Sequence, residues 1–120
     1  MPTSAILTIY NEEDQPICNL YFHYDGYING VGKEIVDFIK EKQLVTSLSV
    51  QSNLDFCNGM EDLAAQIVCH FKNQQPVGGV YLYSVNQQAN TDYNYSIKVH
   101  EGKLELTVIH HNIMTKLFPK

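Results

Sequence analysis

Residues 22–32 hold the residue types in this chain that are best suited to binding or chemistry. The segment reads Phe-His-Tyr-Asp-Gly-Tyr-Ile-Asn-Gly-Val-Gly and carries three of the seven glycines. Glycine lets backbone N–H groups approach a ligand closely, a carboxylate accepts hydroxyl or amino protons, and tyrosine rings stack on flat groups. If the chain has a binding site, we expect it at this turn, formed by Tyr24, Asp25, Gly26, Tyr27, Asn29, Gly30, Gly32 and Lys33.

A purely conformational role for these glycines is an equally good interpretation. Gly26 and Gly30 would then supply positive φ angles for the turn, and Gly32 would let the following helix pack closely on the sheet. Neither common nucleotide motif is present. A phosphate loop needs four residues between its first glycine and the Gly-Lys pair, then a hydroxyl residue, whereas this chain has five and then Glu34. The glycine spacing of dinucleotide-binding folds is also absent.

The charges around the turn favour a neutral or mixed-charge ligand, or the backbone of a protein partner. The start of the expected helix and Lys33 are positive, whereas Asp25 is negative. An Asp followed by Gly is also a common turn former in its own right. The pattern therefore places a site without naming its ligand.

Cysteine, histidine and aspartate supply the alternative of a small hydrolase or transferase. Its reactive group would be Asp25 or a Cys–His pair built on Cys57 or Cys69, and no sequence spacing supports such a pair. The histidines do not stand two apart on an expected strand or four apart on an expected helix, so no metal site is predicted. Cys18, Cys57 and Cys69 form no Cys-x-x-Cys motif, which indicates reduced and mostly buried thiols. We expect no catalytic residue and no cofactor.

The composition indicates one globular domain spanning residues 1–120, with 44% hydrophobic and 18% charged residues. Its eight basic residues are all lysines, and thirteen acids bring the formal net charge to −5. Nucleic-acid binders normally carry a basic patch with arginines, so no nucleic-acid partner is expected. No apolar run reaches the ~20 residues that span a bilayer, and no basic segment precedes an apolar one at the N-terminus. We therefore expect a cytoplasmic protein without a membrane partner.

Alternating and helical patterns define the expected elements. Alternation predicts strands at 5–10 and 17–24, joined as a hairpin, and at 80–85, 92–99 and 104–110, joined as an antiparallel meander. A short strand is expected at 44–50 and irregular chain at 51–57. Helical spacing of apolar residues predicts helices at 30–41 and 59–73, the second opened by a capping box of Asn58 and Glu61. Ala65 and Cys69 lie outside its apolar stripe.

These elements predict an α+β two-layer sandwich, with an antiparallel sheet of about five strands and two helices on one face. Tyrosines are numerous, eight in all, and the chain has no tryptophan. Tyr81, Tyr83, Tyr93 and Tyr95 are expected on two neighbouring strands, as cross-strand pairs. A tyrosine-rich second face suits a partner, so we expect a non-enzymatic binding module that forms a homo-oligomer.

Several short motifs together resemble a family of small uncharacterised proteins of bacterial and phage or prophage genomes. They are Tyr-Asp-Gly-Tyr at 24–27, Gly-Val-Gly at 30–32, Asn-Gly-Met at 58–60, Leu-Ala-Ala-Gln at 63–66 and Gly-Val-Tyr-Leu-Tyr at 79–83. The resemblance extends over residues 17–108. Members of that family tend to have proline after Asp-Gly-Tyr, where this chain has Ile28. The resemblance implies a phage association and no established activity.

Overall fold

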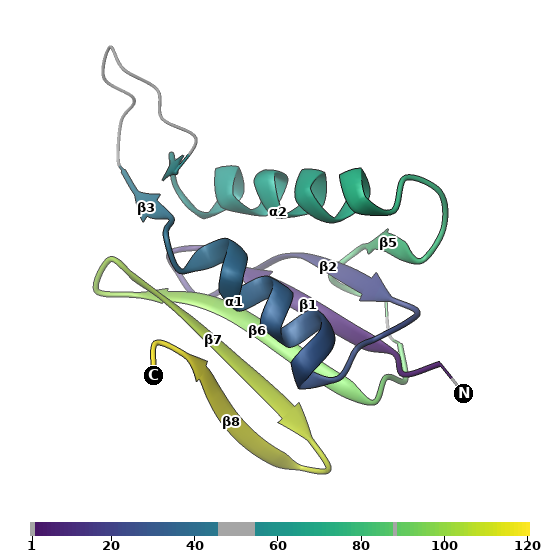
Figure 1. Ribbon diagram of the computed structural model, residues 1–120. Helices are drawn as coiled ribbons and strands as arrows, with labels where there is room; N and C mark the ends of the chain where they lie inside the picture. Colours follow the sequence, from purple (N-terminus) through teal and green to yellow (C-terminus); the bar gives the residue numbers. More distant parts are fainter. Residues whose placement is uncertain (1, 46–54, 88) are drawn as a thin grey trace.

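The structure, a computed structural model, describes residues 2–45, 55–87 and 89–120, which fold as an α+β protein (Figure 1). In these ranges the elements are β1 (Ala5–Tyr10), β2 (Pro16–Phe22), a π-helical turn η1 (Ile28–Gly32), α1 (Lys33–Ile39), β3 (Gln43–Leu44), β4 (Phe56–Cys57), α2 (Met60–Gln74), β5 (Val80–Tyr83), β6 (Tyr93–His100), β7 (Lys103–His110) and β8 (Ile113–Phe118). No helix of the described chain is long and apolar enough to cross a membrane.

The main sheet contains six strands of the described chain, in the order β5-β2-β1-β6-β7-β8. Neighbouring strands are antiparallel except β1 and β6, which are parallel. The sheet is therefore mixed, and the prediction of a wholly antiparallel sheet of about five strands is correct only in part. The predicted hairpin of β1 and β2 is confirmed, with Leu7 opposite Leu20.

The later strands pair differently from the predicted meander of residues 80–110. Strand β5 pairs with β2, not with β6, and the meander that exists consists of β6, β7 and β8. Strand β8 is missing from the prediction. It follows a hairpin turn at His111 and Asn112, whose positive φ angles of 52° and 63° are typical of a two-residue turn. Asn112 ahead of two apolar residues is the sequence signal for this turn.

The connection between β5 and β6 crosses the sheet face opposite the helices, over side chains of β1, β2 and β6. Buried Asn19 anchors this crossing on β2. Its Nδ2 donates a hydrogen bond to the carbonyl oxygen of Ser84 at 3.2 Å, and its Oδ1 accepts one from Thr8 Oγ1 at 2.7 Å. Both bonds matter because a buried amide without partners is costly.

The crossing separates the tyrosines that were expected to pair. Tyr81 and Tyr83 lie on edge strand β5, and strands β2 and β1 stand between them and β6. Tyr83 stacks instead on Tyr21, with ring centroids 5.2 Å apart. Tyr95 points to the helix side, where it is 1% exposed. The predicted pairing of these tyrosines on neighbouring strands is wrong because strand order is set by pairing between distant segments.

One hydrophobic core joins both helices to the same face of the main sheet (Figure 1). The buried residues of the sheet include Ala5, Leu7, Ile9, Leu20, Phe22, Tyr95, Ile97, Leu104, Leu106 and Val108. Those of the helical segments include Val31, Ile35, Ile39, Met60, Leu63, Ala64, Ile67 and Phe71. These are the faces that the apolar spacing predicts. Both predicted segments are helical, because a 3.6-residue apolar period buries one face of a helix. However, α1 covers only Lys33–Ile39 of the predicted 30–41 and follows the π-helical turn η1.

The start of α2 differs from the predicted capping box. Gly59 occupies the N-cap position, and no side chain there accepts a hydrogen bond. The backbone N–H of Met60 instead donates to Glu12 Oε2 at 2.9 Å, and the N–H of Asn58 donates to Asp62 Oδ2 at 2.8 Å. Glu12 belongs to the β1–β2 turn, so this cap depends on tertiary structure that no local motif shows.

The segment between the helices contains a small parallel pair, β3 with β4. The strand expected at 44–50 reduces to Leu44 as the end of β3, and residues 46–50 lie outside the described residues. Phe56 and Cys57 form β4 where irregular chain was expected, and residues 51–54 also lie outside the described residues.

Candidate functional site

A pocket of about 340 Å³ opens beside the glycine-rich turn, between the start of α1 and the end of α2. Its apolar lining comes from Phe22, Val31, Phe71 and Val80. Its polar and aromatic lining comes from Tyr24, Asp25, Asn29, Glu34, Gln74 and Gln75. The structure therefore brings Tyr24, Asp25, Asn29 and Gly30 of the predicted site to one hollow. Gly26, Tyr27, Gly32 and Lys33 do not line it.

The backbone of the turn is held by its own hydrogen bonds. The N–H of Gly30 donates to the carbonyl oxygen of Tyr27 at 2.9 Å, that of Val31 donates to Asp25 at 2.9 Å, and that of Gly26 donates to Thr3 at 2.8 Å. These amides are already used inside the protein. They therefore cannot also bind an anion, which is what clustered glycines suggest. The helix that follows, α1, contains only seven residues, so its N-terminus does not form an anion site either.

The glycines are required by close packing. A Cβ on Gly26 would lie 2.7 Å from Ala5 Cβ, and one on Gly32 would lie 3.0 Å from the Tyr95 hydroxyl. A Cβ on Gly30 would overlap the carbonyl oxygen of Asp25. The expected close approach of Gly32 to the sheet is confirmed. The positive φ angles expected at Gly26 and Gly30 are not found, and the residue with positive φ is Asp25, at 59°.

Tyr95 of β6 connects the glycine-rich turn to the main sheet through a hydrogen bond. Its hydroxyl donates a buried hydrogen bond to the carbonyl oxygen of Gly26 at 2.7 Å. Burial raises the pKa of this hydroxyl well above its ordinary range, because a phenolate would be poorly solvated there. Tyr95 therefore remains a neutral donor and holds the turn in place.

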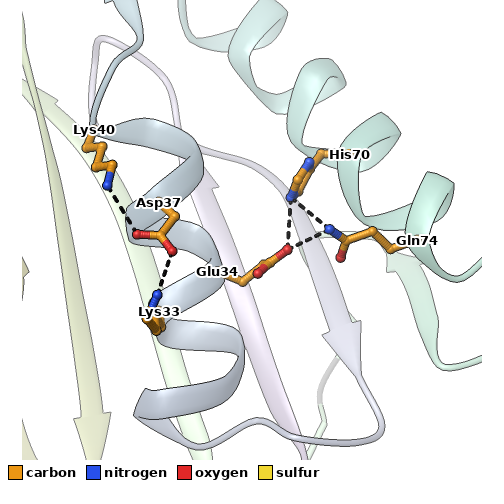
Figure 2. Close-up of polar contacts among 6 residues, drawn as sticks. All are labelled: Lys33, Glu34, Asp37, Lys40, His70 and Gln74. Atoms are coloured by element: carbon orange, nitrogen blue, oxygen red, sulfur yellow. Dashed lines mark hydrogen bonds and ion pairs between the residues drawn. The ribbon is translucent and has the colours of Figure 1, made fainter.

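A polar cluster links α1 to α2 at the edge of the pocket (Figure 2). Glu34 Oε1 accepts a hydrogen bond from Gln74 Nε2 at 2.6 Å and lies 3.3 Å from His70 Nε2. The His70 ring packs on Phe38, with centroids 4.5 Å apart. Glu34 and Gln74 are thus lining residues that sequence reasoning missed. Their meeting depends on how the helices pack, and a helical spacing rule shows only neighbours on one helix.

In the sequence, the positive charge of Lys33 stands close to the negative charge of Asp25, but in the structure Lys33 does not offset it. Lys33 Nζ forms an ion pair with Asp37 at 2.9 Å on the exposed side of α1, away from Glu34 (Figure 2). Its hydrogen bond lowers the pKa of the Asp37 carboxyl. Lys33 is therefore not available to offset Asp25, and the charged side chains that line the pocket are the acids Asp25 and Glu34.

Asp25 itself is exposed, with Tyr27 on one side of it. The Tyr27 hydroxyl donates to Asp25 Oδ1 across a long 3.5 Å contact. The Tyr24 ring is 52% exposed and meets the His23 ring edge to face, with centroids 4.6 Å apart. The Asp25 carboxylate and the Tyr24 ring are thus both accessible to a ligand.

The cysteines offer little to the alternative of a Cys–His nucleophile. Cys57 is buried, and its Sγ donates to Gln66 Oε1 at 3.4 Å. Burial raises the pKa of the Cys57 and Cys18 thiols, whereas a nucleophile needs a thiolate. Cys69 is exposed on α2 and Cys18 is half-buried, so the expectation of mostly buried thiols is correct for Cys57 alone. Within residues 2–45, 55–87 and 89–120, no group of three or more His, Cys, Asp or Glu side chains could hold a metal ion.

Comparisons of the chain with protein-family models, curated proteins and solved structures found no significant match. The resemblance carried by the Tyr-Asp-Gly-Tyr and Asn-Gly-Met motifs therefore stays a prediction.

Proposed function

We propose that this chain is a non-enzymatic binding module, and that the pocket beside the turn binds a small molecule that donates hydrogen bonds and carries no net negative charge. One observation supports this proposal above the others. The charged side chains lining the pocket, Asp25 and Glu34, are both acidic and stand above an aromatic floor of Phe22 and Phe71. An anion would be repelled there.

The size and lining of the pocket suit a small, flat ligand. Pockets for small molecules are mostly about 300–1,000 Å³ and combine apolar walls with a few polar groups, and this one measures about 340 Å³. Asp25 and Glu34 accept hydrogen bonds, while the amides of Asn29 and Gln74 both donate and accept. The exposed Tyr24 ring offers a surface for stacking. A neutral or mixed-charge molecule with amino or hydroxyl groups satisfies all of these.

Binding is favoured over catalysis by what lines the pocket. Its described lining contains no Cys, Ser, Thr or Lys that could act as a nucleophile. The rival hydrolase or transferase would have to use Asp25 or a cysteine, and burial raises the pKa of the Cys57 thiol. The expected homo-oligomer, the absence of a nucleic-acid partner, the cytoplasmic location and the phage association remain predictions beside this proposal.

A thermal-shift screen with matched variants tests the proposal. Nucleosides, nucleotides, amines and other metabolites are screened on the wild type, Asp25→Ala, Glu34→Gln and the control Glu13→Gln. Glu13 is an exposed acid of the β1–β2 turn that does not line the pocket.

We expect a neutral or cationic hit to stabilise the wild type and Glu13→Gln and to stabilise both pocket variants much less. A hit that stabilises all four proteins equally would place binding elsewhere. A hit set made only of anions would contradict the proposed ligand class. Turnover of a hit that Asp25→Ala abolishes would favour the enzyme.

A further inference from the structure

A second hollow, of about 330 Å³, lies at the opposite end of α1 from the first pocket. Its floor is apolar and is formed by Ile39, Leu44, Leu104, Phe118 and Pro119. These residues come from the end of α1, from β3, from β7 and from the end of β8. The hollow is therefore built only when four distant segments have come together.

Three of the residues that line this hollow are lysines, and we call them its rim. Lys103 is exposed, and its ammonium group makes no ion pair with any described residue. Lys40 Nζ reaches Asp37 Oδ1 only at 3.5 Å and its side chain is 50% exposed, while the other Asp37 oxygen is held more closely by Lys33 (Figure 2). Lys42 also lines the hollow, but its ammonium lies 4.5 Å from the centre of the Phe38 ring. We therefore assign the positive charge of the rim to Lys40 and Lys103.

The charge of the hollow is opposite to that of the whole chain. The formal net charge is −5, yet no Asp or Glu is among the described residues that line this hollow. A positive rim attracts a carboxylate, and an apolar floor removes an apolar body from water. We propose that this hollow binds a compact monocarboxylate with an apolar body, independently of the ligand proposed for the first pocket.

A titration with hexanoate, followed by the backbone amide NMR signals of the full chain, tests this assignment. Its uncharged counterpart, 1-hexanol, separates the carboxylate from the apolar body. The variants are the double substitution Lys40→Gln with Lys103→Gln, the single Lys103→Gln and the control Lys116→Gln. Lys116 is an exposed lysine of β8 that does not line the hollow.

We expect hexanoate to shift the amide signals of Gly102, Lys103 and Leu104 in the wild type and in Lys116→Gln. Each lysine lost from the rim should weaken hexanoate binding about two- to fivefold, because exposed ion pairs are weak. Hexanol should bind less tightly than hexanoate to the wild type and equally well to all variants. Asp25→Ala should leave the hexanoate titration unchanged.

Three results would overturn the assignment. The first is an absence of shifts near Leu104 at saturating hexanoate. The second is equal binding of hexanol and hexanoate, which would make the hollow merely apolar. The third is a dependence of the same signals on protein concentration without added ligand, which would show that a second copy of the chain occupies the hollow.

Discussion

The two ends of α1 carry pockets of similar size and opposite charge. The pocket at its start has Glu34 and Asp25 in its lining, and the hollow at its end has Lys40 at its rim. The charges of α1 do not follow the helix dipole, because Lys33 is its first residue and its last turn has no basic residue. The difference teaches that two hollows on one short helix can have linings of opposite charge, and each lining supports its own proposed ligand class.

The largest expected effect concerns the glycine-rich turn beside the first pocket, which we call the acidic pocket because Asp25 and Glu34 line it. The hollow lined by Lys40 and Lys103 is called the basic hollow. Gly30→Ala should destabilise the protein by about 3 kcal/mol, because the new Cβ overlaps backbone that cannot move without breaking the turn. Gly102→Ala beside the basic hollow is the matched control. A Cβ there meets no atom within 4 Å, but φ is 77°, so the cost should be about 1 kcal/mol.

Urea unfolding of both glycine variants measures this difference. Equal losses of unfolding free energy would show that the turn yields to a side chain, and the acidic pocket would then be no more rigid than the hairpin at the other end.

A smaller effect is expected from Tyr95→Phe, which removes the donor to the carbonyl oxygen of Gly26. The variant should lose about 1–3 kcal/mol, because a buried acceptor is left without its partner. Tyr93→Phe, on the same strand, is the control.

The same variant has an expected pH signature. Burial raises the pKa of Tyr95 in the folded chain, so the unfolded chain releases this proton first, at about pH 10. Stability contributed by the neutral hydroxyl is complete below that pH and falls as the pH rises above it. Urea midpoints across the alkaline range should fall more steeply for the wild type than for Tyr95→Phe. Parallel slopes would contradict the burial of this hydroxyl.

The smallest effect concerns Asp37, which forms ion pairs with both Lys33 and Lys40. Asp37→Asn should leave the free energy of unfolding unchanged, because its ion pairs are exposed. It should also tighten hexanoate binding by up to about twofold, since Lys40 then has no competing carboxylate. NMR titration measures this change. Weaker binding would mean that Asp37 holds Lys40 in place for the ligand.

The acidic pocket could be predicted in part from the sequence, and the basic hollow could not. Asp25, Asn29 and Gly30 lie within six residues of the sequence, and their residue types predict a turn that precedes a helix. Glu34 and Gln74 meet only because α1 and α2 pack on one core. The residues that line the basic hollow are spread between Ile39 and Pro119, and no local sequence pattern predicts that they come together.

The same division holds for the fold. Apolar periodicity predicts both helices and the β1–β2 hairpin, since these depend on local spacing and on neighbours in sequence. The place of β5 beside β2, and of β6 beside β1, is set by pairing between segments that lie far apart in the sequence. Edge strand β8 is largely exposed, so it lacks the alternation of buried residues by which strands are found.

The parallel pairing of β1 with β6 has a consequence for the newly synthesised chain. β1 lies in the middle of the finished sheet, with β2 on one side and β6 on the other. β2 emerges from the ribosome soon after β1, but β6 begins only at Tyr93. Until then β1 keeps an open edge beside Leu7 and Ile9, a template for unwanted strand pairing. Translation that stalls after α2 should therefore yield a fragment that aggregates more readily than the full chain.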